Sequence, residues 1–99
     1  MNADQITQPA AWPEGVIGRY LTVGGATVDI QHDAYYVYDT EPTSTVAKCG
    51  GCLDTHTEQW AEYADSFDGG TSWADKEARK WAQAHAETCR ALPRPEVTQ

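Results

Sequence analysis

The chain has 99 residues and a formal net charge of −8, with 15 acidic and 7 basic side chains. This length suits one small domain with a thin core, in which four Trp and five Tyr supply most of the bulk. No apolar run approaches membrane-spanning length, and the N-terminus lacks the basic segment and apolar stretch of a secretion signal. We therefore expect a cytoplasmic protein with reduced thiols and no membrane contact.

The charge is distributed unevenly along the chain. Residues 1–70 hold 11 acidic and 2 basic side chains, a balance of −9, whereas residues 71–99 hold 4 acidic and 5 basic, a balance of +1. An acidic body repels DNA and attracts basic surfaces. The pattern predicts a protein partner with a basic surface and makes nucleic acid the less favoured partner.

Residues 1–13, which include Pro9 and Pro13, are expected to be poorly ordered. A single zinc-stabilised domain is expected over residues 14–92, followed by a C-terminal tail over residues 93–99.

The first part of the domain has the pattern of an antiparallel meander. A hairpin turn at Gly24-Gly25 separates the first two candidate strands, and the second alternates apolar and polar residues. The predicted strands are Val16–Val23, Ala26–Gln31, Tyr35–Tyr38 and the short Thr45–Lys48.

Two helices are predicted after these strands. Thr55-x-x-Glu58 fits a capping box for a first helix, which Asp68-Gly69-Gly70 ends. Ser72-x-x-Asp75 fits the start of a second helix, which runs to about Ala91 before Pro93. The expected apolar stripe of this helix is Trp73, Ala74, Ala78, Trp81, Ala82, His85, Cys89 and Leu92.

All three cysteines and one histidine fall into a metal-ligand pattern, Cys49-Gly-Gly-Cys52 and His85-x-x-x-Cys89. Two glycines allow the tight turn that brings two thiolates to one ion. Positions i and i+4 share one helix face, so His85 and Cys89 point the same way, within the predicted apolar stripe. The pattern predicts one structural Zn²⁺ with four protein ligands. The fold class is then α+β: an antiparallel meander of three to four strands and two helices, joined by this site.

Other assignments of the same residues stay open. Cys49 and Cys52 could form a redox pair with Cys89 as a free thiol, or the cysteines could hold an iron–sulfur cluster. His56 could replace His85 as a ligand. We favour zinc over a disulfide arrangement because the number of cysteines is odd. We favour His85 over His56 because His85 and Cys89 have the i, i+4 spacing of one helix face.

No motif of the sequence indicates catalysis. His32 lies beside Asp33, as a general base and its orienting carboxylate would, but without a nucleophile motif it is interpreted as a turn residue. A zinc with four protein ligands keeps no open position. We therefore expect a protein that is not an enzyme.

Candidate contact residues fall into two groups. The aromatic strand and nearby acids are predicted to contact a protein partner, through Asp29, Asp39, Tyr35, Tyr36 and Tyr38. The alternative is a DNA- or RNA-binding regulator using the basic helix, through Lys76, Arg79, Lys80 and Arg90. Trp60, Trp73 and Trp81 could stack on bases, although their helical spacing favours the core.

The Cys49–Cys52 pair, with the helix segment from Trp81 through His85 and Cys89 to Pro93, resembles a group of small proteins of actinobacteria and their plasmids and phages. The resemblance covers about the second half of the chain and implies a zinc-finger-like accessory protein of a mobile element. The ligand order is also similar to a ββα zinc finger with Cys-Cys-His-Cys ligands, but the span from Cys52 to His85 is far longer. The sequence thus predicts a non-enzymatic interaction module that regulates a basic DNA-handling or transcription protein.

Overall fold

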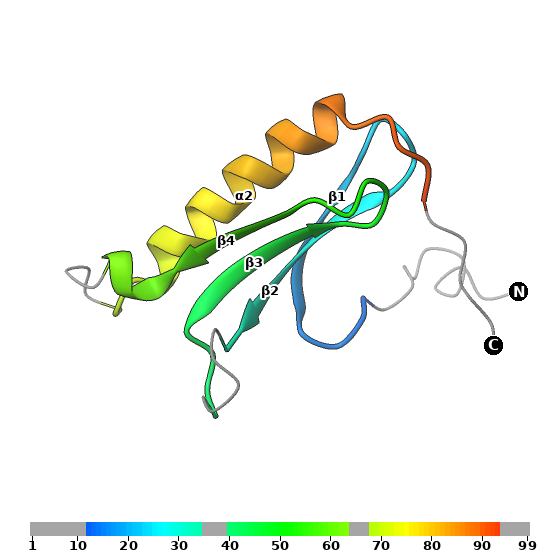
Figure 1. The fold of residues 1–99 in the computed structure, drawn as a ribbon. Helices are drawn as coiled ribbons and strands as arrows, with labels where there is room; N and C mark the ends of the chain where they lie inside the picture. Colours follow the sequence, from blue (N-terminus) through cyan, green and yellow to red (C-terminus); the bar gives the residue numbers. More distant parts are fainter. Residues whose placement is uncertain (1–11, 35–39, 64–67, 94–99) are drawn as a thin grey trace, which may run out of the picture.

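The computed structural model describes residues 12–34, 40–63 and 68–93. One antiparallel sheet contains four strands in sequence order, β1 (Val16–Leu21), β2 (Thr27–Asp33), β3 (Ser44–Cys49) and β4 (Thr55–Gln59). A 3₁₀ helix, η1 (Trp60–Tyr63), follows β4, and helix α2 (Thr71–Thr88) crosses one face of the sheet (Figure 1). The predicted antiparallel meander is confirmed, whereas the prediction of two α-helices is wrong.

The first three strands of the sheet lie close to the predicted segments. The β1–β2 connection turns at Gly24 and Gly25, and Gly25 has a φ of 93°, in the left-handed region that glycine favours. β2 pairs directly with β3, with Ile30 opposite Ala47. The predicted strand Tyr35–Tyr38 lies outside the described residues.

The segment predicted as the first helix is instead strand β4 and η1. β4 pairs with β3, with His56 opposite Ala47 and Thr57 opposite Val46. This pairing satisfies the backbone of β3, and β-branched Thr55 and Thr57 suit a strand. The Glu58 carboxylate therefore contacts His56 and Tyr63 rather than forming the expected capping box.

Helix α2 begins and ends differently from the prediction. Its N-cap is Gly70 rather than Ser72. Only glycine fits this position well, because Gly70 has a φ of 103° and a side chain there would overlap the Trp60 carbonyl. The Asp68 carboxylate accepts the backbone N–H of Gly70 at 3.2 Å and of Ser72 at 3.1 Å. It thus takes the role expected of a capping serine.

The C-terminal end of α2 is closed by the β1–β2 turn. The Val23 and Gly24 N–H groups donate to the carbonyls of Ala86 and Cys89, at 2.9 and 3.0 Å. Because Cys89 is already extended, the helix ends at Thr88 and not near Ala91. Helix-end carbonyls that would otherwise be unpaired are thereby satisfied by the sheet.

A row of alanines brings α2 close to the sheet. Ala74, Ala78, Ala82 and Ala86 are buried at four-residue spacing. Ala78, Ala82 and Ala86 form one core cluster with Val28, Ile30, Ala47 and Cys49 of the sheet, and half-buried Trp81 packs against this cluster. Small side chains on the helix therefore define the contact face, and they leave the core thin.

Two members of the predicted stripe lie outside this contact face. Trp73 is 49% exposed and Leu92 is 75% exposed. The Lys76 ammonium lies 4.9 Å from the centre of the Trp73 ring. The stripe is thus centred on the alanines, and the prediction that Trp73 belongs to the core is wrong.

Within the described residues, α2 lacks the apolar length needed to cross a bilayer.

Candidate metal centre

Four predicted ligands come together at one end of the molecule. Cys49 ends β3, Cys52 follows in the next turn, and His85 and Cys89 lie at the C-terminal end of α2. Their ligand atoms all lie within 4.8 Å of one another. Cys49 is buried, Cys52 is exposed, and His85 and Cys89 are half-buried. The cluster expected from the sequence is present, and it could hold a metal ion.

Two separations between ligand atoms are close to the edges of a tetrahedral zinc site. Two sulfurs about 2.3 Å from one ion, at the tetrahedral angle, lie about 3.8 Å apart, and a sulfur and a nitrogen lie about 3.5 Å apart. The Cys49 and Cys89 sulfurs are 3.8 Å apart. The Cys52 sulfur lies 3.3 Å from Nε2 of His85. The sulfur separation is also far from a disulfide bond, and all three cysteines are free.

The turn between the first two cysteines directs backbone N–H groups at sulfur. Gly51 N–H points to the Cys49 sulfur at 3.4 Å, and Asp54 N–H points to the Cys52 sulfur at 3.5 Å. The turn is closed by Leu53 N–H, which donates to the Cys49 carbonyl at 3.1 Å. Leu53 has a φ of 71°, a strained conformation for a residue with a side chain. The N–H groups that point at the two sulfurs favour the thiolate, the form that binds metal.

The environments of the two thiols in this turn differ. Burial raises the pKa of Cys49, but hydrogen bonds from the backbone of Cys52 and Gly51 and from the His85 side chain outweigh it and lower the pKa to about 7. The Asp54 N–H lowers the pKa of Cys52, but desolvation by nearby atoms and the neighbouring Cys49 and Cys89 thiols outweigh that effect and raise it. The Cys49 thiol therefore ionises more readily than the Cys52 thiol, and a bound cation would favour the thiolate form of both.

Aromatic stacking fixes the imidazole of His85. Its ring stacks on Trp81, with centroids 4.7 Å apart and planes inclined by 13°. His56 stacks on Trp81 as well, at 5.4 Å, and hydrogen-bonds Glu58. His56 is not part of the four-residue cluster, so the structure agrees with His85 as the histidine of the site.

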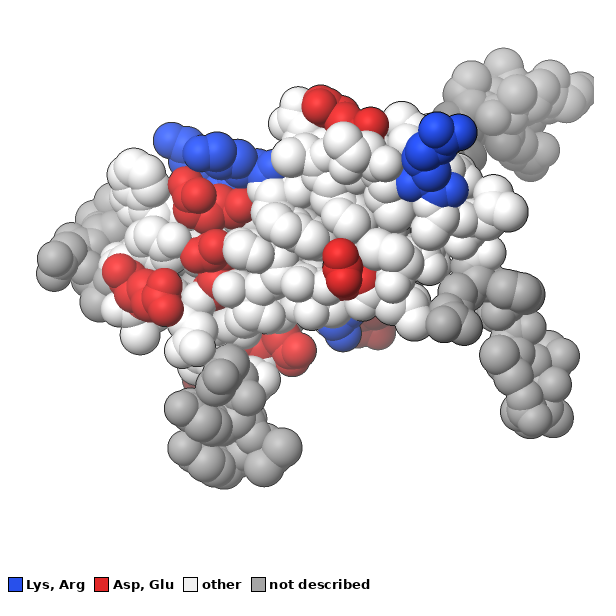
Figure 2. All heavy atoms as spheres, turned by 45° about the horizontal axis from the view of Figure 1, so that its top comes forward, with Lys and Arg blue, Asp and Glu red and all other residues white. Residues whose placement is uncertain are grey.

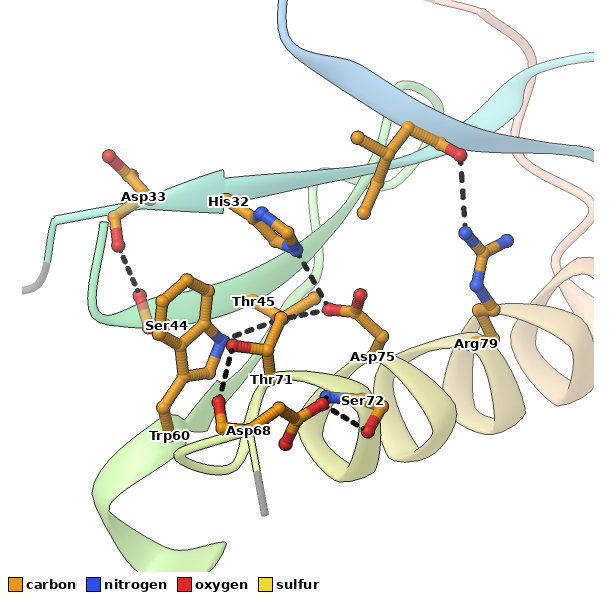
Figure 3. Close-up of polar contacts among 11 residues, drawn as sticks. His32, Asp33, Ser44, Thr45, Trp60, Asp68, Thr71, Ser72, Asp75 and Arg79 are labelled. Atoms are coloured by element: carbon orange, nitrogen blue, oxygen red, sulfur yellow. Dashed lines mark hydrogen bonds and ion pairs between the residues drawn. The ribbon is translucent and has the colours of Figure 1, made fainter. Parts of the chain in front are cut away.

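A second polar anchor, missed by the sequence analysis, holds the other end of α2. Asp75 Oδ1 accepts a 2.6 Å hydrogen bond from the Thr45 hydroxyl and lies 2.9 Å from Nε2 of His32 (Figure 3). Thr45 is fully buried and accepts the Trp60 indole N–H at 2.9 Å. His32 is therefore a strand residue bound to the helix, and the interpretation as a turn residue is wrong. The sequence signal for this placement was that His32 continues the two-residue spacing of buried Val28 and Ile30, which indicates the same face of the strand.

The predicted protein-contact residues are only partly described. Tyr35, Tyr36, Tyr38 and Asp39 lie outside the described residues. Asp29 faces Arg19 on the neighbouring strand, with bidentate contacts of 2.7 and 2.9 Å. Its charge is therefore already neutralised within the sheet.

The residues of the nucleic-acid alternative do not form one surface. Lys76, Arg79 and Lys80 line a common hollow beside β1. Arg90 follows the opposite end of α2. Figure 2 shows basic side chains at separate places on this face rather than in a continuous stripe.

No family model matches the chain, and no curated protein or solved structure is significantly similar to it.

Proposed function

We propose that this chain is a small, non-enzymatic interaction module held together by one structural Zn²⁺ on Cys49, Cys52, His85 and Cys89. The observation that carries the metal assignment is the 3.8 Å separation of the Cys49 and Cys89 sulfurs, an edge of a tetrahedral zinc site. Three sulfurs and an imidazole suit zinc, whereas magnesium and calcium prefer oxygen ligands. Four protein ligands leave no position for a substrate, which supports a structural role.

The ion would join the end of β3 and its following turn to the C-terminal end of α2. Cys49 and Cys52 belong to the end of β3 and the following turn, and His85 and Cys89 belong to the last turns of α2. Between them, the helix contributes mainly alanines to the core. Structural zinc contributes about 10–16 kcal/mol of folding free energy in finger peptides.

Metal content tests the first part of the proposal. Elemental analysis of protein purified under reducing conditions should give one zinc per chain. His85→Gln should lose most of the zinc, and the matched His56→Gln should retain it, because His56 lies outside the cluster. Well under one zinc in the parent protein, or equal loss in both variants, would contradict the zinc site.

The partner is proposed to be a protein with a basic surface. The net charge of −8 supports it, and so does a group of carboxylates near η1. Glu58, Glu77 and Glu62 all raise the pKa of Tyr63, first through the hydrogen bond from its hydroxyl to Glu58. The acidic surface of Glu62 and Glu77 replaces paired Asp29 as the favoured contact region, whereas Glu58 is itself bound to His56 and Tyr63. The regulatory role in a phage or mobile element stays a prediction from the resemblance.

Charge reversal tests the partner. For a basic protein captured on the immobilised chain, Glu62→Lys with Glu77→Lys should slow association by about tenfold at low salt, because complementary charge mainly raises the association rate. Glu14→Lys with Glu87→Lys is the control of equal charge. Equal slowing in both pairs would contradict the acidic surface. Tight duplex DNA binding at moderate salt, lost on reversing Arg79 and Lys80, would favour the nucleic-acid alternative.

A further inference from the structure

A hollow of about 570 Å³ lies between the first half of α2 and β1. This volume is within the usual range of small-molecule sites. It lies outside the metal centre, and its lining residues are Tyr20, Ser72, Asp75, Lys76, Arg79, Lys80 and Gln83.

Three cations and one carboxylate line this hollow. Lys76, Arg79 and Lys80 lie at i, i+3 and i+4, so they share one helix face. Asp75 Oδ1 is already bound by Thr45 and His32. Within the described part of the chain, none of the three cations forms an ion pair. The hollow is therefore a local positive site on an acidic protein.

Arg79 is held in place before any ligand binds. Its Nη2 donates to the Ile17 carbonyl of β1 at 3.2 Å, and Figure 3 shows the side chain reaching from α2 to that strand. Gly18 makes room for it, because a Cβ there would lie 2.7 Å from Nη1. A guanidinium has five N–H donors. One is used on β1, and this bond holds the guanidinium beside the hollow, where further donors remain for an acceptor.

We propose that this hollow binds a small phosphate-bearing ligand, with Arg79 and the two lysines contacting phosphate oxygens and Tyr20 forming an apolar wall. Arginine presents a fork that matches phosphate geometry, and lysine adds point charges. At physiological salt the Debye length is about 8 Å, so these near cations outweigh the distant acidic charge. The proposal is independent of the zinc site and of the basic protein partner.

Binding of pyrophosphate and of ADP to the zinc-loaded full chain tests this proposal. Titration followed by amide chemical shifts should move signals of β1 and of the first half of α2. Lys76→Gln with Lys80→Gln should weaken binding by about tenfold or more, since charged hydrogen bonds are lost. Both lysines are exposed, so the fold should persist. The charge-matched control is Lys48→Gln with Arg90→Gln, which removes two exposed cations elsewhere.

Three results would overturn the assignment. The first is no shift with either probe, and the second is equal weakening in the control pair. The third is binding of a single-stranded oligonucleotide in the hollow when pyrophosphate and ADP do not bind. That third result would assign these cations to nucleic acid instead.

Discussion

Replacing Asp75 with alanine should destabilise the fold strongly, because the change leaves a buried hydroxyl without an acceptor. The Thr45 hydroxyl is fully buried and donates to Asp75 Oδ1 at 2.6 Å. Losing a hydrogen bond to a charged acceptor costs about 1.5–3 kcal/mol. The half-exposed contact with His32 adds little. We expect a loss of about 2–3 kcal/mol, or a fall in Tm on the order of 10–20 °C for a domain of this size.

Two further variants separate the parts of this effect. Asp75→Asn keeps the shape and an acceptor, so it should cost about 1 kcal/mol. Thr45→Val should cost about 1–2 kcal/mol, because the Trp60 indole N–H loses its acceptor. The Asp75→Ala and Thr45→Val double variant should cost less than the sum of the single changes, since no orphaned hydroxyl remains.

Urea unfolding of the zinc-loaded proteins, followed by far-UV circular dichroism, gives these free energies. Zinc content should stay at one per chain in all variants, because the metal ligands lie at the other end of α2. A loss under about 0.5 kcal/mol for Asp75→Ala, or strict additivity with Thr45→Val, would refute the reasoning.

Three smaller predictions concern the turn, the acidic surface and the hollow. Leu53→Gly should keep or raise the unfolding free energy by up to about 1 kcal/mol, whereas Leu53→Val should lower it; the reverse order would contradict strain at this φ of 71°. The hydrogen bond to Glu58, with burial and nearby carboxylates, raises the pKa of Tyr63 to about 12. Its stabilising effect should be complete below pH 10 and lost toward pH 12, and Tyr63→Phe should remove the late step of a 295 nm titration. Gly18→Ala should displace Arg79 at a cost under about 1.5 kcal/mol and weaken pyrophosphate binding; unchanged binding would contradict the role of Arg79.

The ligand cluster was predictable from the sequence because each half of it is local. A Cys-Gly-Gly-Cys turn brings two ligands together, and the last turn of α2 brings His85 near Cys89, the residue that caps the helix; both arrangements depend on short-range geometry. The sequence also indicated the first two strands and their turn, since alternation and paired glycines are local signals.

The error at residues 55–63 shows where local signals end. Thr55-x-x-Glu58 with Trp60 and Tyr63 fits a helix as well as any segment of the chain. Residues 55–59 form a strand instead because the edge of β3 has backbone groups left to pair. Pairing Ala47 with His56 satisfies backbone groups of both segments. β3 and β4 follow one another along the chain as a hairpin, so the deciding interaction is the pairing between the two strands and not the helical pattern within residues 55–63.

The sequence alone determined the acidic charge, the four candidate ligands and the periodicity of α2. Tertiary structure decided which helix face is buried, because four alanines allow closer packing than a face that includes Trp73. It also decided the partners of charged groups: Arg19 neutralises Asp29, and His32 and Thr45 bind Asp75. The Arg19–Asp29 pair depends on the register of a hairpin, and the contacts of Asp75 join residues far apart in sequence, so only the packed sheet and helix define their distances and burial.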